Sequence, residues 1–160
     1  MLHHILIPLD GSQLAEKALD YLHQIAGAET TVTLLIAITP PEHIAYGMYG
    51  EAGMAPVVSP NPAIEYDTIT DDMMEQSRLY LKRVADELRP GMASVTMKIE
   101  VGSPADIIVE TAIAQAVDTI IMSTHGRSGL SRWLLGSVTQ KVLSAAPCPV
   151  CVIPPDRKEK

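Results

Sequence analysis

Short apolar runs alternate with helical patterns along most of this chain. The runs HILIPL at residues 4–9 and TVTLLIAI at residues 31–38 are continuously apolar, which is typical of strands buried on both faces. Two shorter runs of the same kind, DTIIM and PVCVI, occupy residues 118–122 and 149–153. Residues 95–101 instead alternate apolar with polar side chains, so we expect a half-exposed strand at an edge of the sheet.

Helical spacing fills most of the gaps between these strands. Apolar residues at three- and four-residue steps predict a helix over residues 14–26, with Ser12 as its cap, and another over about 70–88, where Thr70-Asp71-Asp72 suits a helix start. Ser103-Pro104 begins a third helix and Gly136-Ser137 a fourth. Strands that alternate with helices in this way predict an α/β fold, a parallel doubly wound sheet with helices on both faces.

The segment from about residue 39 to residue 69 breaks this order. It is rich in Pro, Gly and Tyr and has no usable period, so we expect a long loop. A mobile insertion is the favoured interpretation, and a lid or a partner contact is the alternative. The whole chain of 160 residues is 47% hydrophobic, which suffices for one core and predicts a single domain over residues 1–160.

Charge and segment composition narrow the classes of function. A formal net charge of −7 argues against a general nucleic-acid surface or an anionic-membrane surface, because both need a basic field. No apolar run approaches the ~20 residues that span a bilayer, and the first residues lack the basic and apolar regions of a signal peptide. We therefore expect a cytoplasmic protein without membrane or nucleic-acid partners, in which Cys148 and Cys151 are reduced, buried thiols.

Candidate chemistry follows two of the strands. In a doubly wound sheet, ligands bind beyond the carboxyl ends of the strands, so the turn at Asp10 and the segment from Met122 to Leu143 are the informative ones. Gly126 lets backbone approach a phosphate, and the amides at Gly136-Ser137, at a helix start, can face an anion. Ser137 and Thr139 add hydroxyl donors. The alternatives are a capping box, in which Ser137 and Gln140 only cap the helix, and a simple turn role for Asp10.

Four segments together resemble the universal stress protein family: ILIPLDGS, GSPADIIVETA, THGRSGLSRWLLGSVTQKVL and APCPVCVIPP. The nucleotide-binding branch of that family has the pattern Gly, two residues, Gly, nine residues, Gly-Ser or Gly-Thr. This chain has Gly126 and Gly136-Ser137 at that spacing and Ser123 where the pattern has its first Gly. The expected strand order is 3-2-1-4-5.

The resemblance implies an adenine-nucleotide site. Pro8 and Asp10 would lie at the adenine and ribose end, with Ala37 against the base and Met122 packed on the adenosine, although core filling is the commoner use of Met. Arg127 is favoured to balance a polyphosphate. The residues expected around the phosphates are Ser123, Gly126, Gly136, Ser137, Val138 and Thr139.

The expected function is that of a regulatory or sensor protein in the stress response that binds an adenine nucleotide, with ATP favoured and Mg²⁺ as an accompanying ion. The alternatives are an AMP or cyclic AMP binder and an interaction protein that binds no nucleotide. No P-loop Lys or obvious metal-binding acid is present in the loop, so we expect no catalytic residues and at most weak ATP hydrolysis. The family resemblance and the apolar run Val150 to Ile153 predict a homodimer through the last strand.

Overall fold

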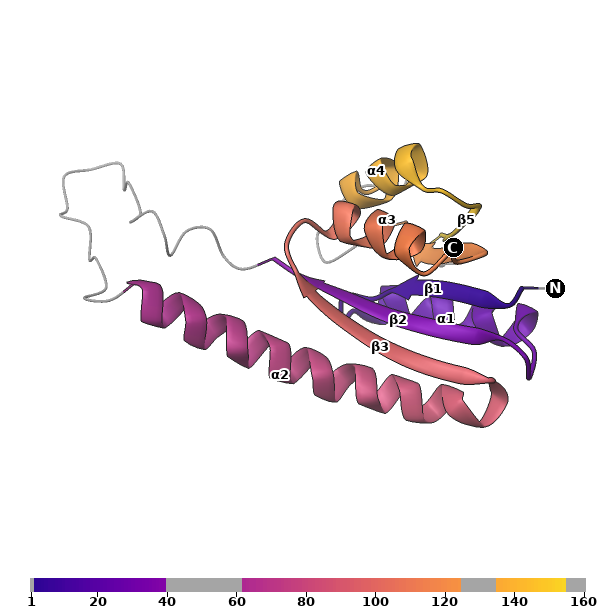
Figure 1. The fold of residues 1–160 in the computed structure, drawn as a ribbon, viewed down its shortest axis with the longest axis horizontal. Helices are drawn as coiled ribbons and strands as arrows, with labels where there is room; N and C mark the ends of the chain where they lie inside the picture. The colour runs from indigo at the N-terminus through magenta and orange to yellow at the C-terminus, as the bar shows by residue number, and fades with distance from the viewer. Residues whose placement is uncertain (1, 40–61, 125–134, 155–160) are drawn as a thin grey trace, which may run out of the picture.

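Five parallel strands pair in one sheet in the order β3-β2-β1-β4-β5 (Figure 1). The protein is represented by a computed structural model that describes residues 2–39, 62–124 and 135–154. The predicted fold class and strand order are confirmed. The strands are β1 (His4–Pro8), β2 (Thr31–Ile38), β3 (Ser94–Val101), β4 (Thr119–Ser123) and β5 (Val150–Ile153).

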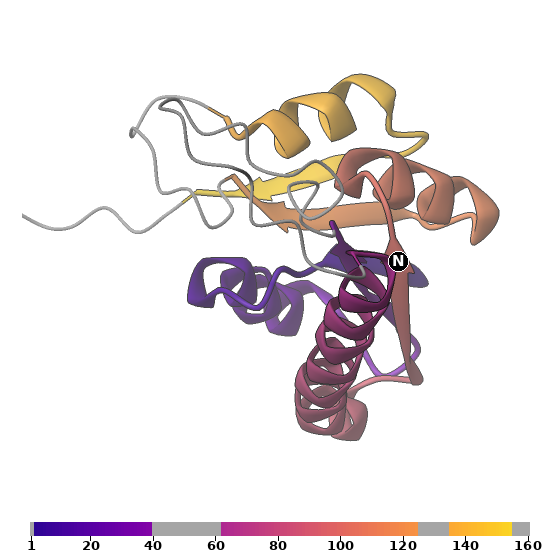
Figure 2. The same cartoon turned by 90° about the vertical axis from the view of Figure 1, so that its left-hand side faces the viewer.

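Helices cover both faces of this sheet, as the doubly wound pattern predicts. Figure 2 shows α1 and α2 on one side of the strands and α3 and α4 on the other. The 3-10 turn η2 (Arg89–Gly91) follows α2 directly, where the sequence predicts a stop at Arg89-Pro90-Gly91. The helices are α1 (Gln13–Ile25), α2 (Pro62–Leu88), α3 (Pro104–Ala114) and α4 (Ser137–Ala145).

The continuous apolar runs supply side chains to both layers. Ile5 and Ile7 of β1 pack with α1 and α2, whereas Leu6 between them packs with α3 and α4. All three side chains are fully buried. Because neighbouring residues of a strand point to opposite faces, a central strand in a two-sided sheet must be apolar at every position.

The longest helix begins earlier than the sequence predicts. Helix α2 starts at Pro62, so residues 62–69 of the predicted loop are helical, and Thr70-Asp71-Asp72 lies inside the helix instead of at its start. Pro suits the first position of a helix, where its missing N–H has no intrahelical partner to lose. Asp71 and Asp72 are exposed, and exposed carboxylates are tolerated in a helix interior. Residues 40–61 of the predicted loop lie outside the described residues.

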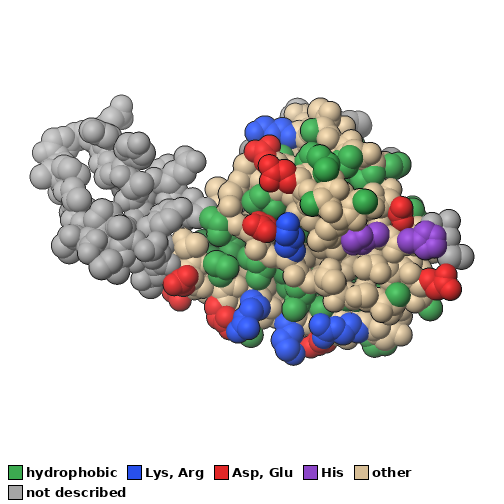
Figure 3. Space-filling view, viewed as in Figure 1, with side chains coloured by type: hydrophobic (Ala, Val, Ile, Leu, Met, Phe, Trp, Pro, Cys, Tyr) green, Lys and Arg blue, Asp and Glu red, His purple; other side chains and the backbone are tan. Residues whose placement is uncertain are grey.

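The two faces of α2 differ as an amphipathic helix requires. Leu81, Val84 and Leu88 are buried against the sheet and Met73 packs against the same core, while its neighbour Met74 is 39% exposed. Basic and acidic side chains alternate along the outer surface of α2, at the lower edge of Figure 3. They form the ion pairs Arg78–Glu75, Lys82–Asp86 and Arg83–Glu87 at 3.0, 3.0 and 3.2 Å.

Local chemistry fixes the other helix starts and the sheet edge. The Ser12 hydroxyl accepts a hydrogen bond from the Ala15 amide at 3.1 Å, which confirms its capping role. Ser103 occupies the cap position of α3 without a side-chain bond, and Pro104 is the first helical residue. Strand β3 lies at an edge of the sheet, as its alternating pattern predicts.

The two cysteines lie on opposite faces of the sheet. Cys151 packs against the core below α1 and α2, and Cys148 against the core below α3 and α4. Both are free thiols, and burial raises the pKa of Cys148. Their separation is as expected, because residues three apart in an extended chain point to opposite sides. The expectation that both are buried is wrong, because the two side chains lie at and beside the edge strand β5 and are only half-buried.

Asp118 ties the start of β1 to the turn that precedes β4. Its Oδ2 accepts hydrogen bonds from the His3 amide at 2.6 Å and from the His4 amide at 2.9 Å. These two bonds lower the pKa of Asp118, because they favour its charged form. Among the described helices, none is both long and apolar enough to cross a membrane.

Two leucines of α2 test the packing of this helix. Leu81 is fully buried and Leu79 is 59% exposed. We expect Leu81→Ala to lower the free energy of unfolding by about 2–5 kcal/mol through lost burial and an added cavity. The matched change Leu79→Ala should alter it by no more than about 0.5 kcal/mol. Urea unfolding measures both, and equal effects would mean that α2 packs by another face.

The Asp118 clamp predicts a pH dependence. Its lowered pKa means that its contribution to stability is complete above the ordinary Asp pKa of about 3.9 and is lost as the pH falls through the folded-state value. Asp118→Asn should therefore reduce Tm at pH 7 and weaken the decline of stability in acid below about pH 4. Asp20→Asn, at an exposed position of α1, is the control. An unchanged acid decline in Asp118→Asn would contradict the clamp.

Candidate functional site

A cavity of about 810 Å³ opens at the carboxyl ends of the strands. Nine of the eleven residues proposed from the sequence line it, and the other two, Gly126 and Arg127, lie outside the described residues. The nine come from β1 and the turn after it, the end of β2, β4 and the start of α4. They are Pro8, Asp10, Ala37, Met122, Ser123, Gly136, Ser137, Val138 and Thr139.

The sheet topology explains the position of this cavity. Strand β1 pairs with β2 on one side and with β4 on the other, so the chain leaves β1 in one direction and returns on its opposite side. The connections then cover opposite faces of the sheet, which leaves a crevice beyond the end of β1. The end of β1 and the start of α4 therefore meet at this point although more than 100 residues separate them.

A tight turn brings Asp10 to the cavity wall. Its Oδ1 accepts a hydrogen bond from the Ser12 amide at 2.9 Å, so Asp10 closes an Asx turn that leads into α1. Gly11 has a φ of +80°, a left-handed conformation that only glycine adopts without strain. The turn role considered for Asp10 is therefore real. The residue also lines the cavity, so its turn role does not remove it from the site.

The start of α4 supplies main-chain donors. Gly136 is the cap residue and Ser137 the first helical residue, without a side-chain cap bond, so the predicted alternative of a Ser137 capping box is wrong. The amide of Gly136 donates to the Thr124 carbonyl at 2.8 Å. The amides of Ser137, Val138 and Thr139 fall in the first turn, where a helix offers no carbonyl partner. They and the helix dipole suit an anion at this end of the cavity.

Thr139 has a different role from the expected hydroxyl donor. Its side chain is 2% exposed, and its Oγ1 lies 3.3 Å from the Ser123 carbonyl oxygen and 3.2 Å from that of Thr124. The single hydroxyl proton is donated to these carbonyls, which fastens the end of β4 to α4. What Thr139 can offer a ligand is its main-chain amide. A sequence does not reveal this, because the acceptors are carbonyls brought close by the fold.

Met122 lies between the core and the cavity. It is 6% exposed, packs in the core below α3 and α4, and also lines the cavity. Ala37 stands near the end of β2 on the same cavity. The walls here are thus largely apolar, which suits the flat face of a heterocycle.

One wall was not foreseen from the sequence. Helix α2 contributes four lining residues, at spacings of three and four, and the start of α3 contributes Pro104 and Ile108. The stripe on α2 looks like an ordinary core-facing pattern. The polar Ser77 on that stripe was the available signal, because a polar side chain on a core-facing stripe requires a partner. The α2 residues are Met73, Gln76, Ser77 and Tyr80.

The lining has little charge. Asp10 is the one ionisable carboxylate among the described residues around the cavity, and neither Lys nor Arg lies among them. Across the described part of the chain, no group of three or more His, Cys, Asp or Glu side chains could hold a metal ion. The geometry is that of a binding crevice with an amide-lined end and an apolar wall.

The fold and the crevice at its switch point are those of a doubly wound α/β protein, a class whose ligands bind beyond the carboxyl ends of the strands. The model of the universal stress protein family matches residues 1–154, and the chain belongs to that family. It is 30% identical over 158 residues to universal stress protein MJ0531 of Methanocaldococcus jannaschii, an alignment that covers 97% of this chain and 84% of that protein.

Solved structures agree with this membership. The structure of protein MJ0577 from the same archaeon has a TM-score of 0.80 and 28% identity and covers 99% of each chain. A universal stress protein family protein from Arabidopsis thaliana with AMP bound has a TM-score of 0.61 over 98% of this chain and 94% of that one. At 15% identity the second likeness shows the shared fold.

Proposed function

We propose that this protein binds an adenine nucleotide, with ATP the favoured ligand, and acts as a regulatory or sensor protein in the stress response. The observation that carries the proposal is the convergence of Asp10 and the first-turn amides of α4 on one cavity. The volume of about 810 Å³ falls within the range of about 300–1,000 Å³ typical of small-molecule sites.

Different parts of the cavity suit the phosphates, the ribose and the base of a nucleotide. The amides of Ser137 to Thr139 receive phosphate oxygens, and Gly126 and Arg127 complete that end in the proposal. A carboxylate oxygen of Asp10 accepts from a ribose hydroxyl. Pro8, Ala37 and Met122 enclose the base. Phosphates held by amides keep their outer oxygens available, so Mg²⁺ accompanies the bound nucleotide through the phosphates.

We propose binding instead of rapid turnover. The segment from Ser123 to Ser137 contains no lysine, aspartate or glutamate, so it lacks the P-loop lysine and the metal-binding acid that fast phosphoryl transfer uses. Hydrolysis of ATP, if measured, should therefore be slow. A cytoplasmic location and action through a change in partner contacts fit such a sensor.

Two alternatives have specific support. The fold relative with AMP bound favours AMP as the physiological ligand, and a universal stress protein of the same fold in complex with cAMP favours cyclic AMP. Ser123, which stands where the family's nucleotide-binding pattern has glycine, favours an interaction protein without nucleotide. The same binding assay separates these from ATP binding.

We also propose a homodimer through β5. Strand β5 is a sheet edge of four apolar residues, whereas the opposite edge, β3, carries Lys98 and Glu100. Charged side chains protect an edge from pairing with a second chain, and an apolar edge lacks that protection. The partner is therefore a second copy of the same strand.

Nucleotide binding is tested by releasing ligand from freshly purified protein for mass spectrometry and by titrating ATP, AMP and cyclic AMP calorimetrically. The informative variant is Ser137→Asp. The helix dipole stabilises a carboxylate at the first helical position, so the free variant should be as stable as the wild-type protein. It should weaken ATP binding at least about tenfold, because like charges about 4 Å apart repel by about 1–4 kcal/mol.

Ser137→Ala is the matched control, since it removes the hydroxyl and leaves the amides in place. We expect only a small loss of affinity. Absence of released nucleotide together with absence of calorimetric binding to the wild-type protein would refute the proposal. If Ser137→Asp and the wild-type protein bind ATP with equal affinity, the phosphates do not lie at the first turn of α4.

Light scattering tests the dimer. The expected species has twice the chain mass of 17.3 kDa. Val152→Lys, on β5, should yield the monomer, whereas Val101→Lys, at the exposed end of β3, should leave the dimer intact. A wild-type protein that runs at 17.3 kDa at every concentration would contradict the proposal.

A further inference from the structure

Tyr80 on α2 has a buried hydroxyl without a partner. The residue lines the cavity, and its oxygen is the one buried side-chain N or O among the described residues that lacks a hydrogen bond. A buried hydroxyl left unpaired costs free energy, so such groups are rare and require an explanation. A partner that enters the cavity would provide one.

The neighbours of Tyr80 hold its ring but leave its oxygen unpaired. The Arg83 guanidinium lies 5.3 Å from the ring centroid, and its Nη2 donates to Glu16 Oε1 at 2.7 Å. Glu16 approaches the Tyr80 hydroxyl closely enough to raise its pKa, yet the two groups do not reach hydrogen-bonding geometry. The aromatic ring is thus positioned before any ligand arrives.

Burial is the main reason that the pKa of Tyr80 lies above its ordinary value, and the carboxylates of Glu16 and Asp10 add to it. Each of these effects disfavours the phenolate. The hydroxyl therefore keeps its proton at physiological pH and is available as a donor. The influence of Asp10 also places Tyr80 near the Asp10 end of the cavity.

The layers of the fold separate this end from the phosphate end. Tyr80 packs with the core on the α1 and α2 side of the sheet, whereas α4 covers the other side. The cavity reaches both, because its lining includes residues of α2 and of α4. A ligand whose phosphates lie at the first turn of α4 would extend its nucleoside toward α2.

We propose that Tyr80 is a specificity-determining residue whose hydroxyl donates a hydrogen bond to an acceptor of the bound nucleoside, either a ring nitrogen of the base or a ribose oxygen. Ser77, one turn earlier on the same stripe, offers a second hydroxyl to the same part of the ligand. This inference rests on the proposed nucleotide site. It adds α2 as the element that recognises the nucleoside.

The test is Tyr80→Phe, which removes the oxygen and keeps the ring. Free Tyr80→Phe protein should have a Tm equal to or above that of the wild type, because an unpaired buried hydroxyl is deleted. ATP binding should nevertheless weaken by about fivefold, the loss of one neutral hydrogen bond. Binding of tripolyphosphate, which has no nucleoside, should be unchanged.

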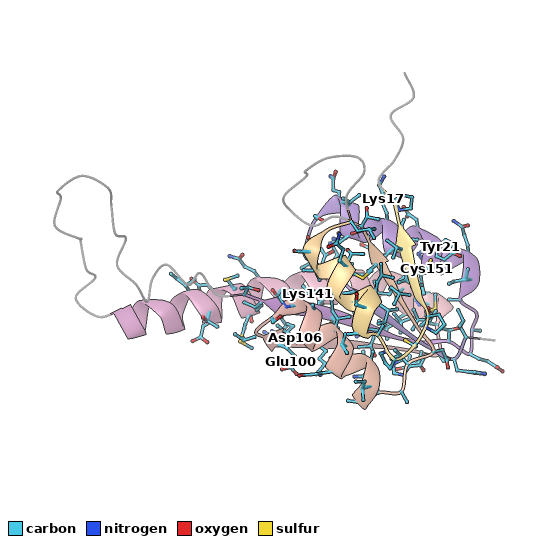
Figure 4. The ribbon with its side chains drawn as sticks, turned by 90° about the horizontal axis from the view of Figure 1, so that it is seen from above. Lys17, Tyr21, Glu100, Asp106, Lys141 and Cys151 are labelled. Carbon is cyan, nitrogen blue, oxygen red and sulfur yellow. The ribbon has the colours of Figure 1, made fainter. Side chains whose placement is uncertain are left out.

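Tyr21→Phe is the matched control. Tyr21 lies on α1, packs against the same core and does not line the cavity; its side chain is labelled in Figure 4. It should leave ATP affinity unchanged. Ser77→Ala gives a second measurement at the proposed contact, with the same pattern of weaker ATP binding and unchanged tripolyphosphate binding.

A comparison of ATP with GTP separates the two acceptors, and either result supports the proposal. If the contact is to the ribose, Tyr80→Phe lowers the affinities for ATP and GTP by the same factor. If the contact is to the base, Tyr80→Phe reduces the difference between the affinities for ATP and GTP. Unchanged ATP affinity, an equal loss for tripolyphosphate, or a lower Tm of the free variant would each overturn it. Failure of the wild-type protein to bind any nucleotide would instead refute the underlying nucleotide site.

Discussion

Burial of β1 on both of its faces is the constraint on which the rest of the structure depends. A strand with apolar side chains above and below it needs a layer of helices on each side, and parallel neighbours supply that through helical crossovers. Strand β1 pairs with β2 and β4, and the crossover from β1 to β2 through α1 and the one from β3 to β4 through α3 cover opposite faces of the sheet. The crevice there is a direct result of burying Ile5, Leu6 and Ile7.

Some residues around this crevice use one polar atom for a structural hydrogen bond and keep another part of the residue at the cavity. Asp10 uses one carboxylate oxygen to close the turn before α1 and still lines the cavity. Thr139 uses its hydroxyl to hold the end of β4, and its main-chain amide remains at the first turn of α4. Main-chain donors held in this way need little reorganisation when an anion arrives, which favours binding.

Helix α2 combines two demands that conflict at one residue. Its stripe from Leu81 to Leu88 closes the core, and the preceding turns of the same stripe form a cavity wall. A phenylalanine at position 80 would satisfy the core without an unpaired oxygen, yet the chain carries tyrosine. Local departures from the best packing occur where a site needs a polar group, and the surrounding core has to offset their cost.

The sequence by itself determined the five strands, the family and nine residues that line the cavity, because period, turn residues and local motifs act over a few neighbouring positions. It overestimated the burial of the run PVCVI, because β5 lies at an edge of the sheet and is only half-buried. The sequence placed the start of α2 too late. Thr70-Asp71-Asp72 has the composition of a helix start, but the same residues also fit an exposed turn in the interior of a helix. Only the tertiary structure decided that the Thr139 hydroxyl is used internally and that Tyr80 reaches the cavity. Both facts depend on contacts between segments far apart in the chain, which no local pattern encodes.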